Sequence, residues 1–316
     1  MTRRLLAACL AALALTGCSA LRHAAAVPPR PHPPVTARAS ARPAAAPHFY
    51  LGVRAQGFPP SWAAVREFSA AVGQAPSLVL FYSGWNEPFP TRLASLVAAH
   101  RITPLIQLNP ENVSLAGIAA GRDDRYLRAY AAAVRSYRDP VVIGFAHEMN
   151  GSWYPWGYGH TSPAVWVRAW QHVVTVFRAA GASNVKWLWT ASAGSDVPGR
   201  LRQYWPGSRY VTWVGIDGYY YTPAKRFTRI FVPAITEIRS FTHDPILLSE
   251  TAIGPVAGQA QMIPNLFAGI RRYHLLGLVW YDVAQHDGRY HQDWRLEGNP
   301  AAITAFRRGL AMIGAG

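Results

Sequence analysis

The feature that most constrains the fold of this chain is a set of eight short apolar runs, each followed by a helix-like or loop segment. Their hydrophobic residues are nearly continuous rather than alternating, as expected of parallel strands that are covered on both faces. The runs lie at residues 49–53, 78–82, 104–108, 141–146, 185–190, 211–216, 246–249 and 278–281. Eight strands alternating with helices over about 260 residues predict a (β/α)8 barrel.

The segments between the runs carry helix signals. Ser162 is placed to cap a helix that has Pro163 in its first turn and Gly181 at its end. Similar periodicity predicts helices over residues 61–72, 91–100, 123–137, 228–241, 259–274 and 300–310. The connection after the fifth run, around residues 198–205, is weak as a helix.

A doubly wound open sheet is the alternative arrangement of such alternating elements. The first run is followed by Gly52-Val53-Arg54-Ala55-Gln56-Gly57, which lacks the glycine spacing of a dinucleotide-binding loop. A nucleotide-binding sheet is therefore less favoured. The prediction is a single α/β domain with a TIM-barrel fold.

The N-terminal segment reads as a targeting sequence rather than part of the fold. Arg3 and Arg4 precede an apolar run over residues 5–15, which is too short to span a bilayer as a mature helix. The four residues that follow, LTGC at 15–18, resemble the lipobox of bacterial lipoproteins. Residues 1–17 are therefore predicted to be a signal peptide and Cys18 the site of lipid attachment. An ordinary secretory signal with a chance cysteine is the alternative.

Residues 18–47 are predicted to be a tether between that lipid anchor and the folded domain. They consist largely of Ala, Pro and Arg, which cannot bury enough apolar surface to offset the entropy of ordering. Cys9 would be removed with the signal, so Cys18 would remain alone and could form no intrachain disulfide. The expected protein is a monomer with its domain at 48–316, secreted and anchored to the outer face of the bacterial membrane.

The formal net charge of +15 raises the question of nucleic acid or acidic lipid as a partner. Six arginines lie in residues 1–47, where there is no acidic residue, which leaves +9 for the rest of the chain. The remaining basic residues form no dense run of the kind that follows a phosphate backbone. We therefore expect a solvated basic surface and no nucleic-acid partner.

A glutamate follows two of the apolar runs, with Glu148 two residues after the fourth and Glu250 directly after the seventh. The chemistry of a (β/α)8 barrel is carried at the carboxyl ends of its strands, and the fourth and seventh strands lie on roughly opposite sides of the mouth. Paired carboxylates across a site are what cleavage of a glycosidic bond requires. One protonates the departing oxygen, while the other attacks the sugar or positions water.

The sequence around the first glutamate resembles a known family. HEMNGSWYPWG at residues 147–157 is similar to the acid/base motif of glycoside hydrolase family 26, whose best-known members are endo-β-1,4-mannanases. The resemblance extends over the domain from about residue 48. It implies a (β/α)8 barrel and a retaining glycosidase that needs neither a cofactor nor a metal.

The resemblance also implies the roles of individual residues. Glu148 matches the general acid/base and Glu250 the nucleophile, while His147 matches a histidine that fixes and tunes these groups. Tyr219 is expected to hydrogen-bond the nucleophile. The other residues expected to support the site or bind substrate are Asn150, Trp153, Trp156 and Trp280, with Trp280 as the aromatic floor under the sugar. Flat aromatic side chains suit this purpose because sugar rings present apolar CH faces.

Several other polar residues belong to types found in catalytic or metal-binding motifs, but their positions or spacing do not establish such a role. Asn86-Glu87-Pro88 looks like an acid/base motif of the wider clan, but it follows the second run, so we interpret it as a loop. Histidines at positions 147, 160, 243, 286 and 291 lack the i, i+4 spacing of a helical metal site. Asp217 and Asp282, near strand ends, are open to either sugar binding or structural hydrogen bonding.

The substrate is less constrained than the reaction. The third run continues to Asn109, where the mannanases carry a histidine-containing segment that binds substrate. β-1,4-Mannan is the expected polysaccharide, with mixed-linkage β-glucan and β-1,3-xylan as alternatives within the family. A polysaccharide-binding protein with little catalysis is the alternative from a different class.

Overall fold

The computed structural model describes residues 49–59, 61–193, 201–254, 256–285 and 292–314. The chain divides into two compact units, Met1–Ala45 and Ala46–Gly316, and the described residues belong to the second. The predicted signal peptide, Cys18 and tether therefore lie outside the described residues. Within them, no helix combines the length and apolar character that crossing a membrane requires.

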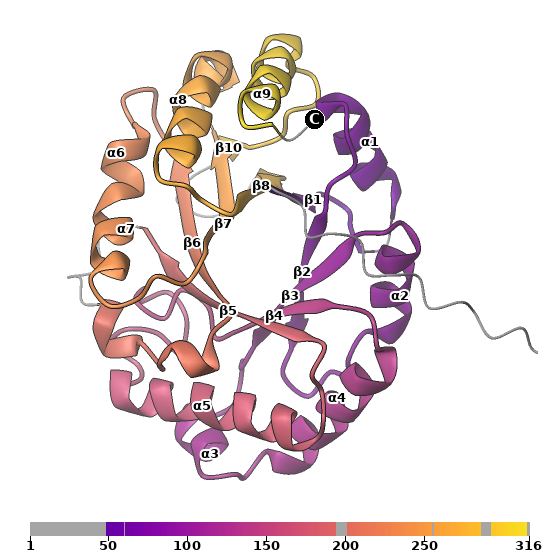
Figure 1. Cartoon of the computed structure of the whole chain (residues 1–316), viewed down its shortest axis with the longest axis vertical. Coiled ribbons are helices and arrows are strands. Elements are labelled where there is room, and N and C mark those ends of the chain that lie inside the picture. Colours follow the sequence, from indigo (N-terminus) through magenta and orange to yellow (C-terminus); the bar gives the residue numbers. More distant parts are fainter. Residues whose placement is uncertain (1–48, 60, 194–200, 255, 286–291, 315–316) are drawn as a thin grey trace, which may run out of the picture. The chain divides into compact units, whose positions relative to one another are not determined.

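The second unit is built around a closed barrel in which strands β1 to β8 pair in sequence order and in parallel (Figure 1). The predicted (β/α)8 fold is thereby confirmed. The strands are β1 (Tyr50–Ala55), β2 (Leu78–Gly84), β3 (Thr103–Asn109), β4 (Val141–Phe145), β5 (Val185–Ser192), β6 (Trp213–Tyr220), β7 (Ile246–Ile253) and β8 (Gly277–Asp282). A short antiparallel pair, β9 (Ala284–Gln285) and β10 (Gln292–Asp293), follows β8 and was not predicted.

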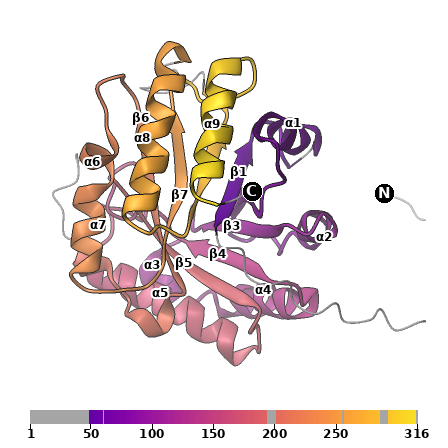
Figure 2. The same ribbon diagram turned by 45° about the horizontal axis from the view of Figure 1, so that its top comes forward.

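Helices surround the barrel, and α8 and α9 lie side by side in both ribbon views (Figures 1 and 2). The α-helices are α1 (Ala63–Val72), α2 (Thr91–Ala99), α3 (Leu115–Ala119), α4 (Asp124–Tyr137), α5 (Pro163–Ala179), α6 (Phe227–Ile230), α7 (Val232–Arg239), α8 (Gln259–Arg272) and α9 (Pro300–Met312). In the described part of the connection after β5 there are only 3-10 turns, at Leu201–Tyr204 and Ser208–Tyr210. This agrees with its weak helical pattern.

The helix expected over 228–241 is two helices instead, α6 and α7. Pro233 stands in the first turn of α7. A proline has no N–H to continue the bonding of a preceding helix, but it is well accommodated where a new one begins.

The inside of the barrel is filled by an apolar layer to which every strand contributes. These residues form a cluster separate from the larger one between strands and helices, and they are Tyr50, Leu78, Leu80, Leu105, Val142, Leu188, Trp213, Leu247 and Val279. Successive side chains of a strand point to opposite faces, so residues two further along from this layer also face inward. They lie nearer the carboxyl ends, where the barrel mouth opens.

Strand β7 departs from regular pairing just before this mouth. Gly215 of β6 pairs with Leu247, whereas Asp217 pairs with Glu250, so β7 contains one residue more than its neighbour over this stretch. A bulge of this kind allows two successive side chains to reach the same side of a sheet. Here it places both Ser249 and Glu250 within hydrogen-bonding distance of inward-facing groups on β6.

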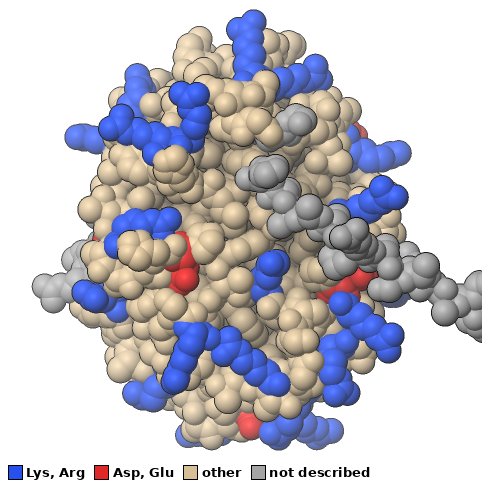
Figure 3. Space-filling view, viewed as in Figure 1, with Lys and Arg blue, Asp and Glu red and all other residues tan. Residues whose placement is uncertain are grey.

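On the face seen in Figure 3, Lys and Arg side chains are scattered over the surface, mostly toward its edge, with other residues between them. This is the scattered arrangement expected from the sequence, in which the basic residues form no dense run.

Candidate active site

Polar side chains replace apolar ones directly above the apolar layer inside the barrel. They stand on several strands, two or four positions beyond a residue of that layer, and include Tyr82, Gln107, Thr190, Asp217, Ser249 and Tyr281. Alternation along the strands therefore builds a polar floor at the mouth. The two predicted catalytic glutamates lie at this level.

Glu148 is positioned by a sharp change of backbone direction at the end of β4. Ala146 and Glu148 both have positive φ angles, +48° and +51°, which are uncommon for residues with a side chain. The Glu148 N–H donates to the Thr190 carbonyl at the end of β5 over 2.9 Å. The local conformation is held by the neighbouring strand, and such conformations are concentrated at functional sites.

The Glu148 carboxyl accepts a 2.8 Å hydrogen bond at Oε2 from the indole N–H of Trp153. Burial and the nearby Glu250 raise the pKa of Glu148 to about 8, while hydrogen bonds from Trp153 and Ser192 oppose this rise. A carboxyl with this pKa is protonated at neutral pH, as a general acid must be before the first step of the reaction.

Trp153 reaches this position because Gly151 leaves room for its ring. A Cβ at Gly151 would lie 2.3 Å from a carbon of the Trp153 indole, so any other residue would displace the ring. The side chain of Trp153 remains half exposed. It thus combines a bond to the acid with a free aromatic surface at the mouth.

Glu250 has a different set of partners. Tyr82 of β2 donates its hydroxyl to Oε1 over 2.5 Å, and Tyr219 of β6 donates to Oε2 over 2.6 Å. Burial raises the pKa of Glu250, while the two phenols and the Arg54 charge oppose it. Burial also raises the pKa of both phenols well above the usual value, so both remain protonated donors.

The two carboxyls interact as a pair, because the charge of Glu250 contributes to the raised pKa of Glu148. Glu250 has two phenol donors and a nearby cation, all of which favour its ionised form. Glu148 has weaker support for a charge. The shared electrostatics therefore place the proton on Glu148 and the negative charge on Glu250.

A third carboxyl, Asp217, lies beneath this pair. It is 1% exposed and accepts a 2.6 Å hydrogen bond from the Ser249 hydroxyl, while its Oδ2 has no hydrogen-bond partner among the described residues. Burial and the charges of Glu250 and Glu148 raise its pKa well above the usual range. This shift favours the protonated form of Asp217, which carries no negative charge beside Glu250.

Neither ring nitrogen of His147 hydrogen-bonds a glutamate, because Nδ1 has no hydrogen-bond partner among the described residues and Nε2 is paired with Tyr154. His147 is 2% exposed, and its Nε2 is 3.1 Å from the Tyr154 hydroxyl. Burial lowers the pKa of His147 to about 3, so the ring is neutral. Its carbonyl accepts the indole N–H of Trp156, which is also buried and stacks on the ring of Tyr154. His147 and Trp156 thus form the supporting layer of the loop after β4.

Asn150 joins the same loop to the end of β5. Its side-chain amide donates to the Ser192 carbonyl over 2.8 Å and its oxygen accepts from the Ser192 N–H over 2.9 Å. Both amide groups are used by the backbone, and the residue is buried. This geometry fits the supporting part of the predicted role.

The prediction that Trp280 forms an open floor under the sugar is wrong. Val279 faces the inside of the barrel, so the next residue along β8 faces outward. Trp280 is fully buried, its ring packs edge-on against Phe306 of α9, and its N–H donates to the Trp294 carbonyl. It is Tyr281, one residue further, that turns toward the mouth, with its ring centroid 5.7 Å from that of Tyr219.

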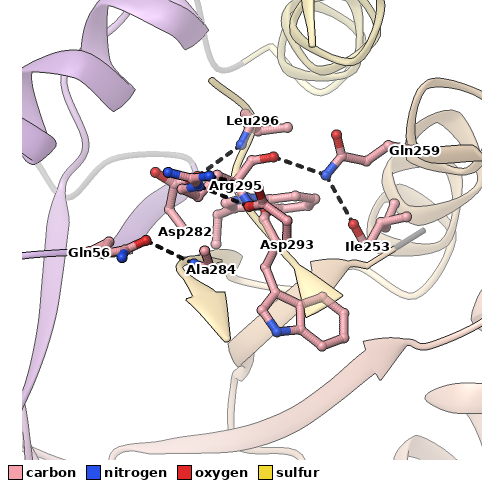
Figure 4. Close-up of polar contacts among 10 residues, drawn as sticks. Gln56, Ile253, Gln259, Asp282, Ala284, Asp293, Arg295 and Leu296 are labelled. Atoms are coloured by element: carbon pink, nitrogen blue, oxygen red, sulfur yellow. Dashed lines mark hydrogen bonds and ion pairs between the residues drawn. The ribbon is translucent and has the colours of Figure 1, made fainter. Parts of the chain in front are cut away.

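The segment after β8 supplies a further aromatic residue that sequence reasoning missed. Trp294 is buried, with its ring centroid 5.1 Å from that of Tyr219. Hydrogen bonds between side chains and backbone groups hold this segment in place, as Figure 4 shows. The Ala284 N–H donates to Gln56, the Leu296 N–H donates to Asp282, and Gln259 donates to the carbonyls of Ile253 and Arg295. Asp282 therefore has a structural role, one of the two left open for it.

The Asn86-Glu87-Pro88 segment is a loop, as predicted. Glu87 is exposed and accepts a 2.8 Å hydrogen bond from the Gly84 N–H at the end of β2. The described residues contain no group of three or more His, Cys, Asp or Glu side chains that could hold a metal ion. His286 and His291 lie outside the described residues.

The model of glycosyl hydrolase family 26 matches residues 123–265. Endoglucanase H of Acetivibrio thermocellus is 28% identical over 279 residues, which cover 82% of this chain and 30% of that protein. The β-1,3-xylanase TXYA of a Vibrio species is 26% identical over 172 residues, covering 50% of this chain and 36% of that one. The chain thus spans about a third of the length of these relatives.

Among solved structures, a family 26 β-mannanase from Bacteroides ovatus superposes with a TM-score of 0.63 at 16% identity, covering 84% of this chain and 89% of that one. The catalytic domain of a family 26 endo-β-1,4-mannanase from a Bacillus species gives 0.63 at 16% identity, with 83% and 85% covered. At this identity the likeness establishes the fold.

A (β/α)8 barrel with paired carboxyls at the ends of its fourth and seventh strands defines the class of barrel glycosidases. Within that class, the matches confirm the resemblance found in the sequence. Residues 123–265 of the chain match glycosyl hydrolase family 26, and the similarity to Endoglucanase H extends beyond them.

Proposed function

We propose that this protein is a retaining endo-β-glycosidase that cleaves a β-linked polysaccharide. The observation that carries the proposal is the unequal pair at the mouth. Glu148 has a raised pKa of about 8 despite hydrogen bonds from Trp153 and Ser192, and Glu250 is held at both oxygens by phenols. One group is ready to give a proton and the other to attack.

In the first step, an oxygen of Glu250 bonds to the anomeric carbon as the glycosidic C–O bond breaks. The proton of Glu148 passes to the departing oxygen. In the second step, Glu148, now ionised, takes a proton from water, whose oxygen displaces Glu250 from the anomeric carbon. Each step inverts that carbon, so the overall configuration is retained.

The substrate we propose is β-1,4-mannan. The proposal is supported by the similarity of residues 147–157 to the mannanase motif and by the fold shared with the family 26 mannanases. The half-exposed indole of Trp153 suits a flat sugar face beside the acid.

A second candidate substrate class is β-1,3-xylan or mixed-linkage β-glucan. Two of the matched relatives are named a β-1,3-xylanase and an endoglucanase. In addition, Asn109 at the end of β3 is buried, and its Oδ1 has no hydrogen-bond partner among the described residues. The Asn109 amide oxygen can accept a hydrogen bond from a sugar hydroxyl at the end of β3. It would therefore select hydroxyls differently from the histidine-containing segment that the mannanases carry there.

A panel of purified mannan, mixed-linkage glucan and β-1,3-xylan tests the activity and the substrate together. We expect reducing ends to be released from one polymer, with intermediate-sized products that indicate internal cutting. Proton NMR of the first product should show the β anomer. Binding to a polymer without product release would instead favour the polysaccharide-binding alternative, and an α anomer would exclude the retaining mechanism.

For the location, we propose a monomer attached to the outer face of the cell membrane through lipid on Cys18. The support is the order of charged, apolar and LTGC segments in residues 1–18. Membrane fractionation of the wild type and Cys18→Ser tests it. The wild type should require detergent for release, and the variant should be recovered without detergent.

A further inference from the structure

Tyr82 is a residue that the resemblance to family 26 did not single out. Tyr82 stands on β2 two residues beyond Leu80, so its side chain continues the inward-facing column of that strand. Its hydroxyl donates to Oε1 of Glu250, and Tyr219 donates to Oε2. Strands β2 and β6 are four apart in a barrel of eight, so the phenols approach Glu250 from opposite sides.

The other neighbours of Tyr82 add to this arrangement. The guanidinium carbon of Arg54 lies 5.7 Å from the centroid of the Tyr82 ring, and Nη1 of Arg54 is fixed by the Ala55 carbonyl at 2.6 Å. The ring centroid of His147 is 5.9 Å from that of Tyr82. Tyr82 therefore lies between a fixed cation, the nucleophile and the supporting layer of the loop after β4.

We propose that Tyr82 is a second positioning residue for the nucleophile, acting together with Tyr219 to hold both oxygens of Glu250. The proposal rests on the retaining glycosidase function proposed above and deepens it. Its consequence concerns the two chemical steps, because the charge on Glu250 changes between them.

A phenol bonds more strongly to a charged carboxylate than to an ester oxygen. In the first step the Glu250 charge is lost as its oxygen bonds to the anomeric carbon, and in the second it returns as that bond breaks. Interactions that strengthen on the way to the transition state accelerate a step. The Tyr82 bond therefore favours the second step, the release of Glu250 from the sugar.

The first test does not depend on catalysis. Protein labelled with 13C at the Glu carboxyl carbons is titrated by NMR, with the Glu250 signal assigned by its absence in Glu250→Gln. Tyr82→Phe and Tyr219→Phe should each raise the pKa of Glu250 by about one unit, the size expected for one hydrogen bond to a charged group. The matched control is Tyr281→Phe, since Tyr281 lies at the same mouth but is not one of the hydrogen-bond donors to Glu250. It should leave the titration unchanged.

The second test measures the step itself. An aryl β-glycoside with a good leaving group makes the first step fast, so the covalent glycosyl-enzyme should accumulate in Tyr82→Phe and be seen by intact mass. We expect kcat to fall about tenfold, with an apparent KM that falls with it, because one lost donor at a developing charge has effects of roughly this size or larger.

The outcomes separate this proposal from the function on which it rests. If Tyr82→Phe titrates like the wild type, or shows no build-up of the intermediate while the wild type is active, Tyr82 has only a packing role. If the wild type cleaves no glycoside, the proposed function fails. The titration still decides in that case whether Tyr82 controls Glu250.

Discussion

The indole N–H of Trp153 donates to Oε2 of Glu148 over 2.8 Å, from a side chain that remains half exposed. This bond acts on the ionised form of Glu148 more strongly than on the protonated form, so it lowers the pKa of the acid. Burial dominates and keeps that pKa near 8. Trp153 thus limits how far burial raises the pKa of Glu148.

Trp153→Phe keeps an aromatic ring and removes the donor. We expect the pKa of Glu148 to rise, by up to about one unit. The basic limb of the kcat/KM profile, where the general acid loses its proton, should therefore move to higher pH. Trp62→Phe is the control, because Trp62 stacks on His100 and contributes no hydrogen bond to either carboxyl. A basic limb that stays in place or moves down would contradict this role of the indole.

The raised pKa of Glu148 also predicts how stability depends on pH. The carboxyl titrates near 4.5 when exposed and near 8 in the folded protein, so between these values the folded state holds a proton that the unfolded state has released. Its contribution to the free energy of unfolding is therefore complete below about pH 4.5 and is lost as pH rises to about 8. The largest possible slope is about 1.4 kcal/mol per pH unit.

Urea unfolding of the wild type and Glu148→Gln, from pH 5 to pH 9, measures this contribution. The variant cannot ionise, so the wild type should lose stability relative to it as the pH rises. Glu87→Gln, a change of the same kind at an exposed glutamate, should run parallel to the wild type. If the free energy of unfolding of Glu148→Gln and of the wild type changed with pH in parallel, the pKa of Glu148 would not be raised in the folded protein.

The apolar runs, the motif at 147–157 and the two glutamates were sufficient to predict the barrel and the position of its acids. Strand order follows from the runs because parallel strands with helical connections pair in sequence. The role of Tyr82 was missed because nothing at 78–82 distinguishes a tyrosine facing Glu250 from one in the core. The orientation of Tyr82 becomes evident only from the structure, where Leu80 belongs to the inner apolar layer and Tyr82, two residues further along, faces the same way.

The error at Trp280 has the opposite cause. A motif comparison gives a residue type near a strand end, but the face on which it lies depends on the register of the whole strand. With Val279 in the barrel interior, a shift of one residue moves the tryptophan to the helix side. The bulge in β7 could not be predicted either, since it depends on pairing with two neighbouring strands at once.

Trp280 should consequently behave as a core residue. Trp280→Ala removes a fully buried indole and is expected to cost about 3–5 kcal/mol of the free energy of unfolding. Trp280→Phe keeps most of the contact with Phe306 and should leave KM for the polymer near the wild-type value while lowering stability. Urea unfolding and steady-state kinetics give both quantities. A large rise in KM with unchanged stability in Trp280→Phe would restore the sugar-floor role.

The assignment of the two acids makes opposite predictions for their alanine variants in the presence of azide. Glu250→Ala leaves space on the nucleophile side, so azide can attack the anomeric carbon directly and give the α-glycosyl azide. Glu148→Ala still forms the covalent intermediate from an aryl β-glycoside, and azide then displaces Glu250 to give the β-glycosyl azide. Without azide, turnover of a polysaccharide should fall by about 10²–10⁴-fold when the general acid is removed, and further still without the nucleophile. Glu87→Ala should match the wild type, and the same azide anomer from both catalytic variants would refute the assignment.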